Sequence, residues 1–158
     1  MREKIIEYIK KAWNGEKCSR LLDITSAIDI QALEVANSII DKLNEIQDRE
    51  KYDHIKKVKI YAVDFDHTKE RHFGANETRT DQIPLTFDDI PLLVDTLLSP
   101  QLVRLGTLRQ DTGAGIHFIS QLDNGKMICV LIKVKPQKET YKNRTIYKKK
   151  LKDGSKNS

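Results

Sequence analysis

The sequence has little cysteine, no long apolar run and no secretory segment. Its two cysteines, Cys18 in a polar turn and Cys129 in an apolar run, differ too much in setting for a disulfide framework or a metal site. We therefore expect thiols in a reducing compartment. No stretch approaches the ~20 apolar residues that a membrane span needs, and the N-terminus begins an amphipathic helix. These features predict a cytoplasmic protein without a membrane partner, delivered there alone or within a larger polypeptide.

The motifs of several large enzyme classes are absent as well. The chain has no GxGxxG, no P-loop, no HExxH and no GxSxG. The one acidic pair that suggests a metal, Asp88-Asp89, stands where a helix cap is expected, and no second carboxylate-rich motif accompanies it. We expect neither a metal nor another cofactor.

Positive charge, by contrast, is plentiful and concentrated at the C-terminal end. Residues 133–158 hold ten Lys or Arg and two Asp or Glu, whereas the other 132 residues hold 18 and 21. A localised basic segment attracts phosphates, so we expect a polyanionic partner, with RNA as the first choice. Residues 152–158 have the composition of a disordered basic tail outside any site.

The periodicity of the apolar residues changes along the chain. In the first hundred residues spacings of three and four predict helices, with Asp29 or Ser26 and the Thr86 segment as their caps, over residues 2–13, 29–47 and 90–98. A short strand is expected over residues 58–65, and an exposed loop over residues 75–82.

Alternation of apolar and polar residues dominates the last third. It predicts strands over residues 103–109, 116–122, 126–135 and 141–150. Residues 113–115 read as a glycine turn, Asn124-Gly125 as a hairpin turn, and residues 126–135 as the central strand. Helices followed by strands indicate an α+β fold, with N-terminal helices packed on a four-stranded antiparallel β-sheet.

One short segment concentrates acid–base and phosphate-binding side chains. His67, Arg71 and His72 fall within six residues, in what reads as one or two helical turns that Gly74 ends. RNA cleavage without metal needs a base for the 2′-oxygen proton, an acid for the leaving 5′-oxygen and a cation for the extra phosphate charge. Imidazole and guanidinium suit these roles. An exposed polar turn with two histidines by chance is the alternative.

The last strand carries a second candidate group. Alternation predicts that Asn143, Thr145 and Tyr147 share one face, and that Arg144 and Lys148 lie on the other. A hydroxyl and a phenol side by side could hold a phosphate and stack a base. Alternatively, these residues are ordinary strand formers on a lysine-protected edge.

Two further histidines lie outside these groups. His117 lies on a predicted strand between Ile116 and Phe118, which would point the other way, and such a histidine is more often structural than catalytic. His54 lies in a charged connection and is assigned no role.

The order of these segments resembles a known family. A segment His67-x-x-x-x-His72 followed by Gly74 precedes Gln82-Ile-Pro84-Leu-Thr86-Phe-Asp88-Asp89-Ile90, a short helix, a sheet and a final Arg144-Thr145-Ile-Tyr147-Lys-Lys-Lys. This order resembles the phage-associated nuclease-like domains grouped with barnase, EndoU, the tRNA-cleaving colicins and RelE, the BECR fold. The resemblance covers roughly residues 58–150, and the Thr-x-Tyr ending is similar to that of EndoU-type members.

The resemblance implies a domain division and a function. Residues 1–57 would be a helical extension and residues 58–151 the nuclease domain. The implied activity is a metal-independent endoribonuclease, toxin-like or phage-associated, that cleaves RNA such as tRNA to a 2′,3′-cyclic phosphate and has an immunity protein or antitoxin as partner. The implied catalytic residues are His67, Arg71, His72, Thr145 and Tyr147, and the expected RNA-binding residues are Arg144, Lys148, Lys149 and Lys150.

Two other functions fit the same sequence. A non-catalytic RNA-binding module would use the same basic sheet and retain RNA in a salt-dependent way without cleaving it. A protein-interaction domain, such as an immunity or phage structural component, would use the acidic N-terminal part with its long amphipathic helix, residues 29–47.

Overall fold

The computed structural model describes residues 1–46, 51–65, 82–83, 85–109, 113–122, 125–134 and 142–150. Of these, residues 82–83, 107–109, 113 and 142–150 are described by their backbone alone. The helices are α1 (Arg2–Trp13), α2 (Ile30–Ile46) and α4 (Ile90–Leu98), with short 3-10 turns η1 (Thr25–Ala27) and η3 (Phe87–Asp89). All three predicted helices are therefore confirmed to within a residue at each end.

The strands form two antiparallel sheets. The larger sheet has the order β3-β7-β6-β5-β4, and its members are β3 (Gln82–Ile83), β4 (Leu102–Arg109), β5 (Gly113–Gln121), β6 (Lys126–Val134) and β7 (Lys142–Lys150). The smaller sheet pairs β1 (Leu21–Asp23) with β2 (Lys59–Tyr61). The α+β class and the central place of β6 are confirmed, whereas the sheet has five strands rather than four.

The additional strand β3 is only two residues long. Gln82 pairs with Lys149, and Ile83 pairs with Lys148, so β3 extends the sheet beyond β7. A two-residue strand offers no alternation to detect, so the sequence predicts a loop at Gln82.

Two other sequence predictions were wrong in detail. Only Lys59–Tyr61 of the predicted strand 58–65 is extended, and residues 62–65 are helical. Residues 113–115 are not a turn, since β5 begins at Gly113 and Ala114 pairs with Val134. The glycines at 113 and 115 suggested the turn, but both lie within β5, where Gly113 pairs with Arg109 and Gly115 pairs with Lys133.

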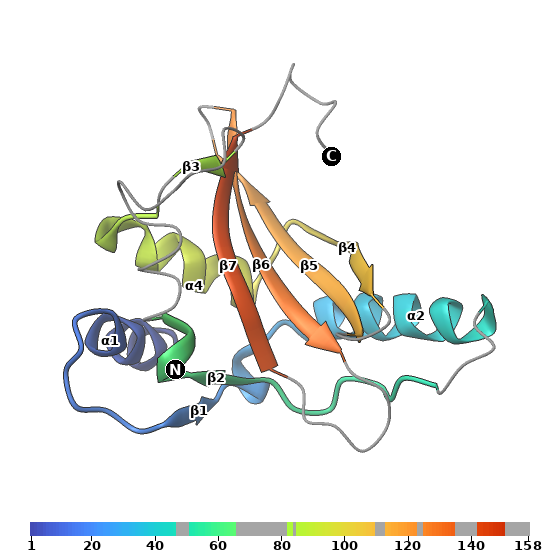
Figure 1. Ribbon diagram of the computed structural model, residues 1–158, viewed down its shortest axis with the longest axis horizontal. Coiled ribbons are helices and arrows are strands. Elements are labelled where there is room, and N and C mark those ends of the chain that lie inside the picture. The colour runs from blue at the N-terminus through green and yellow to red at the C-terminus, as the bar shows by residue number, and fades with distance from the viewer. Residues whose placement is uncertain are drawn as a thin grey trace.

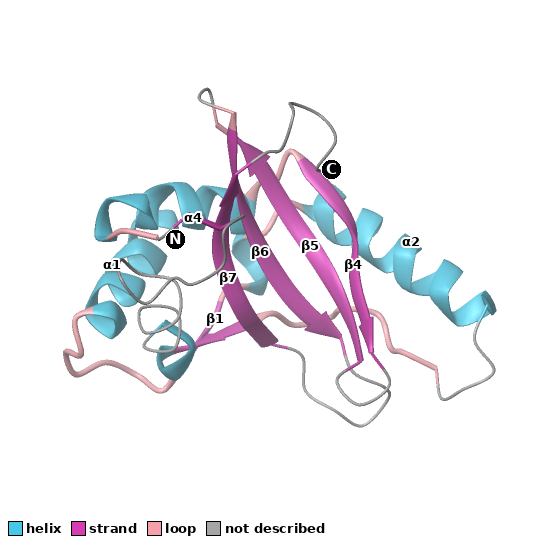
Figure 2. Cartoon of the chain, turned by 45° about the horizontal axis from the view of Figure 1, so that its top comes forward, coloured by secondary structure: helices cyan, strands magenta, loops and turns pink. Residues whose placement is uncertain are grey.

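The core lies between the helices and one face of the larger sheet. Figures 1 and 2 show α1, α2 and α4 on the same side of that sheet. The alternating residues of β5 and β6 that face the helices are almost fully buried in one cluster with residues of all three helices: Ala114, Ile116, Phe118, Val130, Ile132 and Val134. Because Ile5, Ile9 and Ile40 belong to the same cluster, the core runs across the predicted domain boundary at residues 57/58.

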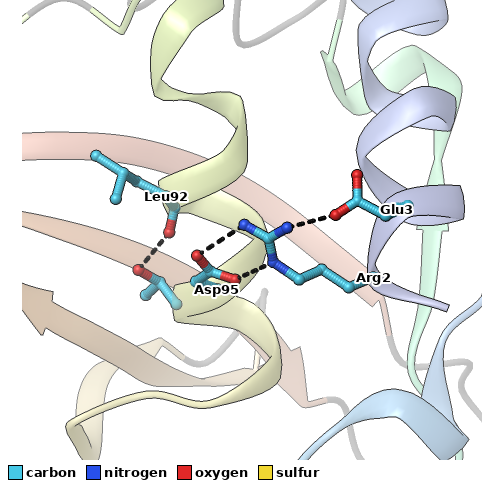
Figure 3. Close-up of polar contacts among 5 residues, drawn as sticks. Arg2, Glu3, Leu92 and Asp95 are labelled. Carbon is cyan, nitrogen blue, oxygen red and sulfur yellow. Dashed lines mark hydrogen bonds and ion pairs between the residues drawn. The ribbon is translucent and has the colours of Figure 1, made fainter.

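Polar contacts fix the helices to one another. Figure 3 shows Arg2 of α1 donating to both carboxylate oxygens of Asp95 in α4, at 2.6 and 3.1 Å, and to Glu3 at 2.6 Å. At the start of α2, Asp29 caps the helix by accepting a hydrogen bond from the Gln31 N–H at 3.0 Å, as predicted. The Asp29 N–H itself donates to the Leu98 carbonyl at 2.8 Å, which joins α2 to the end of α4. None of the described helices has the length and apolar content for a membrane span.

Candidate nucleic-acid interface on the sheet

The face of the larger sheet opposite the helices, here called the outer face, differs from the core face. No labelled helix covers it in Figures 1 and 2. Its floor is a second, small cluster of Ile119, Met127 and Cys129, which are 2 to 3% exposed. The outer face therefore has an apolar floor of its own, and its polar residues lie beside that floor.

Strand register aligns one row of residues across this face. Arg104 pairs with His117, His117 pairs with Leu131, and Leu131 pairs with Thr145. We call these four residues the central row. Directly opposite residues in antiparallel strands have Cβ atoms about 5 Å apart on the same face. The row thus spans four strands, or roughly 14 Å at the usual spacing between strands.

The neighbouring row is more apolar. Leu102 pairs with Ile119, Ile119 pairs with Cys129, and Cys129 pairs with Tyr147. Thr145 and Tyr147 therefore stand at the β7 ends of two adjacent rows, and His117 stands two strands away from Thr145, beyond Leu131.

A β-bulge interrupts the sheet at each end of the central row. On β4, the step from Leu105 to Leu108 is three residues long, whereas the facing step from Ile116 to Ala114 is two, so Gly106 or Thr107 is the extra residue. On β7, Leu131 pairs with Thr145 while Ile132 pairs with Asn143, so Arg144 is the extra residue. Bulges re-aim side chains and are frequent beside active sites.

The bulge in β7 corrects one sequence prediction. Strict alternation predicted that Asn143 shares a face with Thr145 and Tyr147. Asn143 instead pairs with Ile132, which belongs to the main core, whereas Thr145 pairs with Leu131 of the outer face. A bulge inserts one residue into the period of two, and no residue type in 142–150 signals it.

Gly106 makes room for the imidazole of His117. A Cβ atom built on Gly106 would stand 2.4 Å from Nε2 of His117 and 2.5 Å from its Cδ2. Such separations are far below van der Waals contact. The ring therefore rests directly on the backbone of β4, and it is half-buried there.

Arg104 stands directly opposite His117 in the register of β4 with β5. Arg104 is half-buried and makes no side-chain hydrogen bond or ion pair within the part of the chain that the structure describes. It is the functional candidate that sequence reasoning missed. Only its position opposite His117 indicates a role for Arg104, and that position is known only from the register of β4 with β5.

The strands of the sheet carry positive charge only. The four long strands β4 to β7 contain nine Lys or Arg and no Asp or Glu. Lysine even stands opposite lysine at both ends of the β6–β7 pair, as Lys126 with Lys150 and Lys133 with Lys142. Like charges in directly opposite positions destabilise a sheet, so an arrangement of this kind suits a surface that meets a polyanion.

The predicted site residues fall into two groups. His67, Arg71 and His72 lie outside the described residues. Thr145 and Tyr147, with Arg144, Lys148, Lys149 and Lys150, lie on β7, and the structure gives their backbone register. The chain enters the histidine segment from Phe65, which is fully buried, and returns at Gln82, which pairs with Lys149.

Other ionisable groups lie away from the sheet's outer face. His54 forms an exposed ion pair with Asp41 of α2 at 2.6 Å. Burial raises the pKa of Tyr8 in α1 to about 12, and its hydroxyl donates to the Ser19 carbonyl at 2.7 Å. Among the described residues no three His, Cys, Asp or Glu are grouped so that they could hold a metal ion. Neither Cys18 nor Cys129 forms a disulfide.

Comparisons with known proteins return no match. No protein-family model, no curated protein and no solved structure is similar to the chain. The resemblance to BECR-fold nucleases therefore stays a prediction from the residues quoted above.

Proposed function

We propose that the chain is a metal-independent endoribonuclease that binds RNA across the outer face of its larger sheet. The observation that carries this proposal is the central row, with its basic end at Arg104, its hydroxyl end at Thr145 and a bulge beside each end. The absence of acidic residues from the four long strands supports a polyanion as the ligand.

In the proposed reaction a ribose 2′-oxygen attacks the adjacent phosphorus. One of His67 and His72 takes the 2′-oxygen proton as the O2′–P bond forms, and the other donates a proton to the 5′-oxygen as the P–O5′ bond breaks. Arg71 stabilises the charge of the phosphorane, and Thr145 and Tyr147 position the phosphate. The products are a 2′,3′-cyclic phosphate and a 5′-hydroxyl.

The chain path is compatible with this division of roles. Residues 75–81 separate the histidine segment from β3, and β3 pairs with β7 at Lys148 and Lys149, next to Tyr147. A short stretch of chain therefore connects the segment to the strand that carries the proposed phosphate-positioning residues. An enzyme of this kind acts in the cytoplasm on RNA such as tRNA, and a toxin-like or phage-associated role would add an immunity protein or antitoxin as a partner.

Cleavage of total tRNA in the presence of EDTA tests the proposal. We expect fragments that end in 2′,3′-cyclic phosphates from the wild type and a large loss with His72→Ala, since removal of a general acid or base costs about 10²- to 10⁴-fold. His54→Ala is the matched control, because His54 is exposed and paired with Asp41 on α2. Intact tRNA with the wild type, or equal cleavage by His72→Ala, would exclude the proposed reaction.

A non-catalytic RNA-binding module is the second candidate, and the lysine pairs at both ends of β6 and β7 favour it equally. It predicts retention of RNA that weakens with salt, without fragments. The combined substitution Lys148→Glu, Lys149→Glu and Lys150→Glu should then abolish retention.

A further inference from the structure

Two side chains on the outer face, Arg104 and His117, make a pair that the proposed reaction does not use. They stand directly opposite each other on β4 and β5, and both are half-buried. The pair lies at the β4 end of the central row, and Leu131 separates it from Thr145. The pair is therefore a separate candidate site on the outer face and not part of the Thr145–Tyr147 end.

The surroundings of the pair suit an anion. Their own strands, β4 and β5, contain no Asp or Glu, and neither does β6, the next strand across the face. Arg104 has no carboxylate partner within the described residues. A guanidinium offers five N–H donors in a planar fork that matches two phosphate oxygens, and the ring of His117 on the opposite strand flanks the position of Arg104. Partial burial strengthens such charge-assisted hydrogen bonds relative to open water.

The backbone of β4 holds the imidazole in place. The ring lies against Gly106, where any side chain would collide with it, and the bulge at this point bends the strand. The glycine thus creates the space in which His117 stands beside Arg104. Its φ lies outside the left-handed region, so the close approach, rather than the backbone conformation, is what requires glycine.

We propose that Arg104 and His117 form a phosphate-binding subsite for a phosphodiester group of single-stranded RNA that neighbours the cleaved one. The pair deepens the proposed function and rests on it for the position of the cleaved phosphate at the Thr145–Tyr147 end. Roughly 10 Å, two strand spacings, separate His117 from Thr145.

The test measures binding without cleavage. A short 2′-O-methyl oligouridylate cannot be cut, because its 2′-oxygen cannot attack, and inorganic phosphate serves as the minimal probe. In NMR titrations of the full chain we expect both probes to shift the imidazole signals of His117 and the Nε signal of Arg104. Arg104→Gln should weaken oligouridylate binding by about ten- to a hundredfold, the range for a hydrogen bond to a charged group.

Three variants provide the control and test the geometry of the subsite. Arg20→Gln removes a positive charge from an exposed arginine stacked on Tyr61, and should change affinity by less than about twofold. Arg104→Lys keeps the charge but loses the fork, and should bind between the wild type and Arg104→Gln. Gly106→Ala displaces the ring of His117 without removing it, and should weaken binding as well.

The outcomes separate the subsite from the proposed reaction. Unshifted His117 signals together with equal oligouridylate affinity for wild type and Arg104→Gln would overturn the subsite, even if the wild type cleaves tRNA. Shifts at both residues and weaker binding by Arg104→Gln would support the subsite, even if tRNA stays intact and the reaction is excluded.

Discussion

The imidazole of His117 lies so close to Gly106 that a Cβ atom there would come within 2.4 Å of Nε2. The contact joins β4 to β5 at the bulge, two residues after Arg104, which pairs with His117. A glycine in a strand normally weakens it, since glycine loses more conformational entropy on folding than any other residue. At this position glycine lowers the stability of the strand but leaves room for the imidazole of His117.

This contact predicts strong coupling between residues 106 and 117. Gly106→Ala should lower the free energy of unfolding by about 1 to 3 kcal/mol, the usual cost of forcing extra atoms into occupied space. In a His117→Ala background the new methyl group meets no ring, so the same substitution should cost far less. A double-mutant cycle by denaturant unfolding measures the difference. Equal costs in both backgrounds would show that the ring does not occupy this space.

Tyr8 gives the chain a defined alkaline response. Burial raises the pKa of its hydroxyl from about 10 to about 12, so the fold favours the protonated phenol. A group whose folded pKa is raised contributes stability that is complete below the unfolded pKa, here near pH 10, and is lost as the pH rises through 12. The free energy of unfolding should therefore fall between pH 10 and 12 by on the order of 1 kcal/mol more in the wild type than in Tyr8→Phe.

Spectrophotometric titration provides an independent measurement of the same group. The chain has five tyrosines. One phenol should ionise later than the ordinary value near 10, and Tyr8→Phe should remove that late component. Parallel unfolding curves for the two proteins up to pH 12 would contradict the assignment.

Lys133 tests the electrostatic part of the account. It pairs with Gly115 on one side and with Lys142 on the other, in strands without acidic residues. If it neutralises a phosphate, Lys133→Gln should lower the slope of log affinity for single-stranded RNA against log salt by about 0.7. Lys17→Gln, a substitution of an exposed lysine between α1 and β1, should leave the slope unchanged. The same slope for all three proteins would place the RNA elsewhere.

The sequence predicted the fold where apolar residues repeat over many positions. Helices α1, α2 and α4 and the central strand β6 follow from such repeats, and Asp29 caps α2 as its residue type suggests. The sequence did not predict the short strands β1 and β3. They have three and two residues and depend on pairing with distant segments. Residues 113–115 show the converse error, in which two glycines within a strand resembled a turn.

The site was less predictable for a similar reason. Thr145 and Tyr147 were proposed from alternation, but the importance of Arg104 follows only from its register opposite His117. The bulges in β4 and β7 determine which residues share a row across the sheet. A bulge adds a single residue, which alternation of apolar and polar residues cannot predict. The histidine segment, with His67, Arg71 and His72, lies outside the described residues, and its role stays a prediction.

The most direct measurement of the central claim is a map of the RNA contact on the protein. Backbone and side-chain NMR signals of the full chain, followed on addition of a 2′-O-methyl oligouridylate, report contact without cleavage. The account predicts shifts concentrated in β4, β5 and β7, at Arg104, His117, Thr145 and Tyr147, with α2 unaffected. Shifts confined to α2, or none on the outer face at saturating RNA, would contradict it.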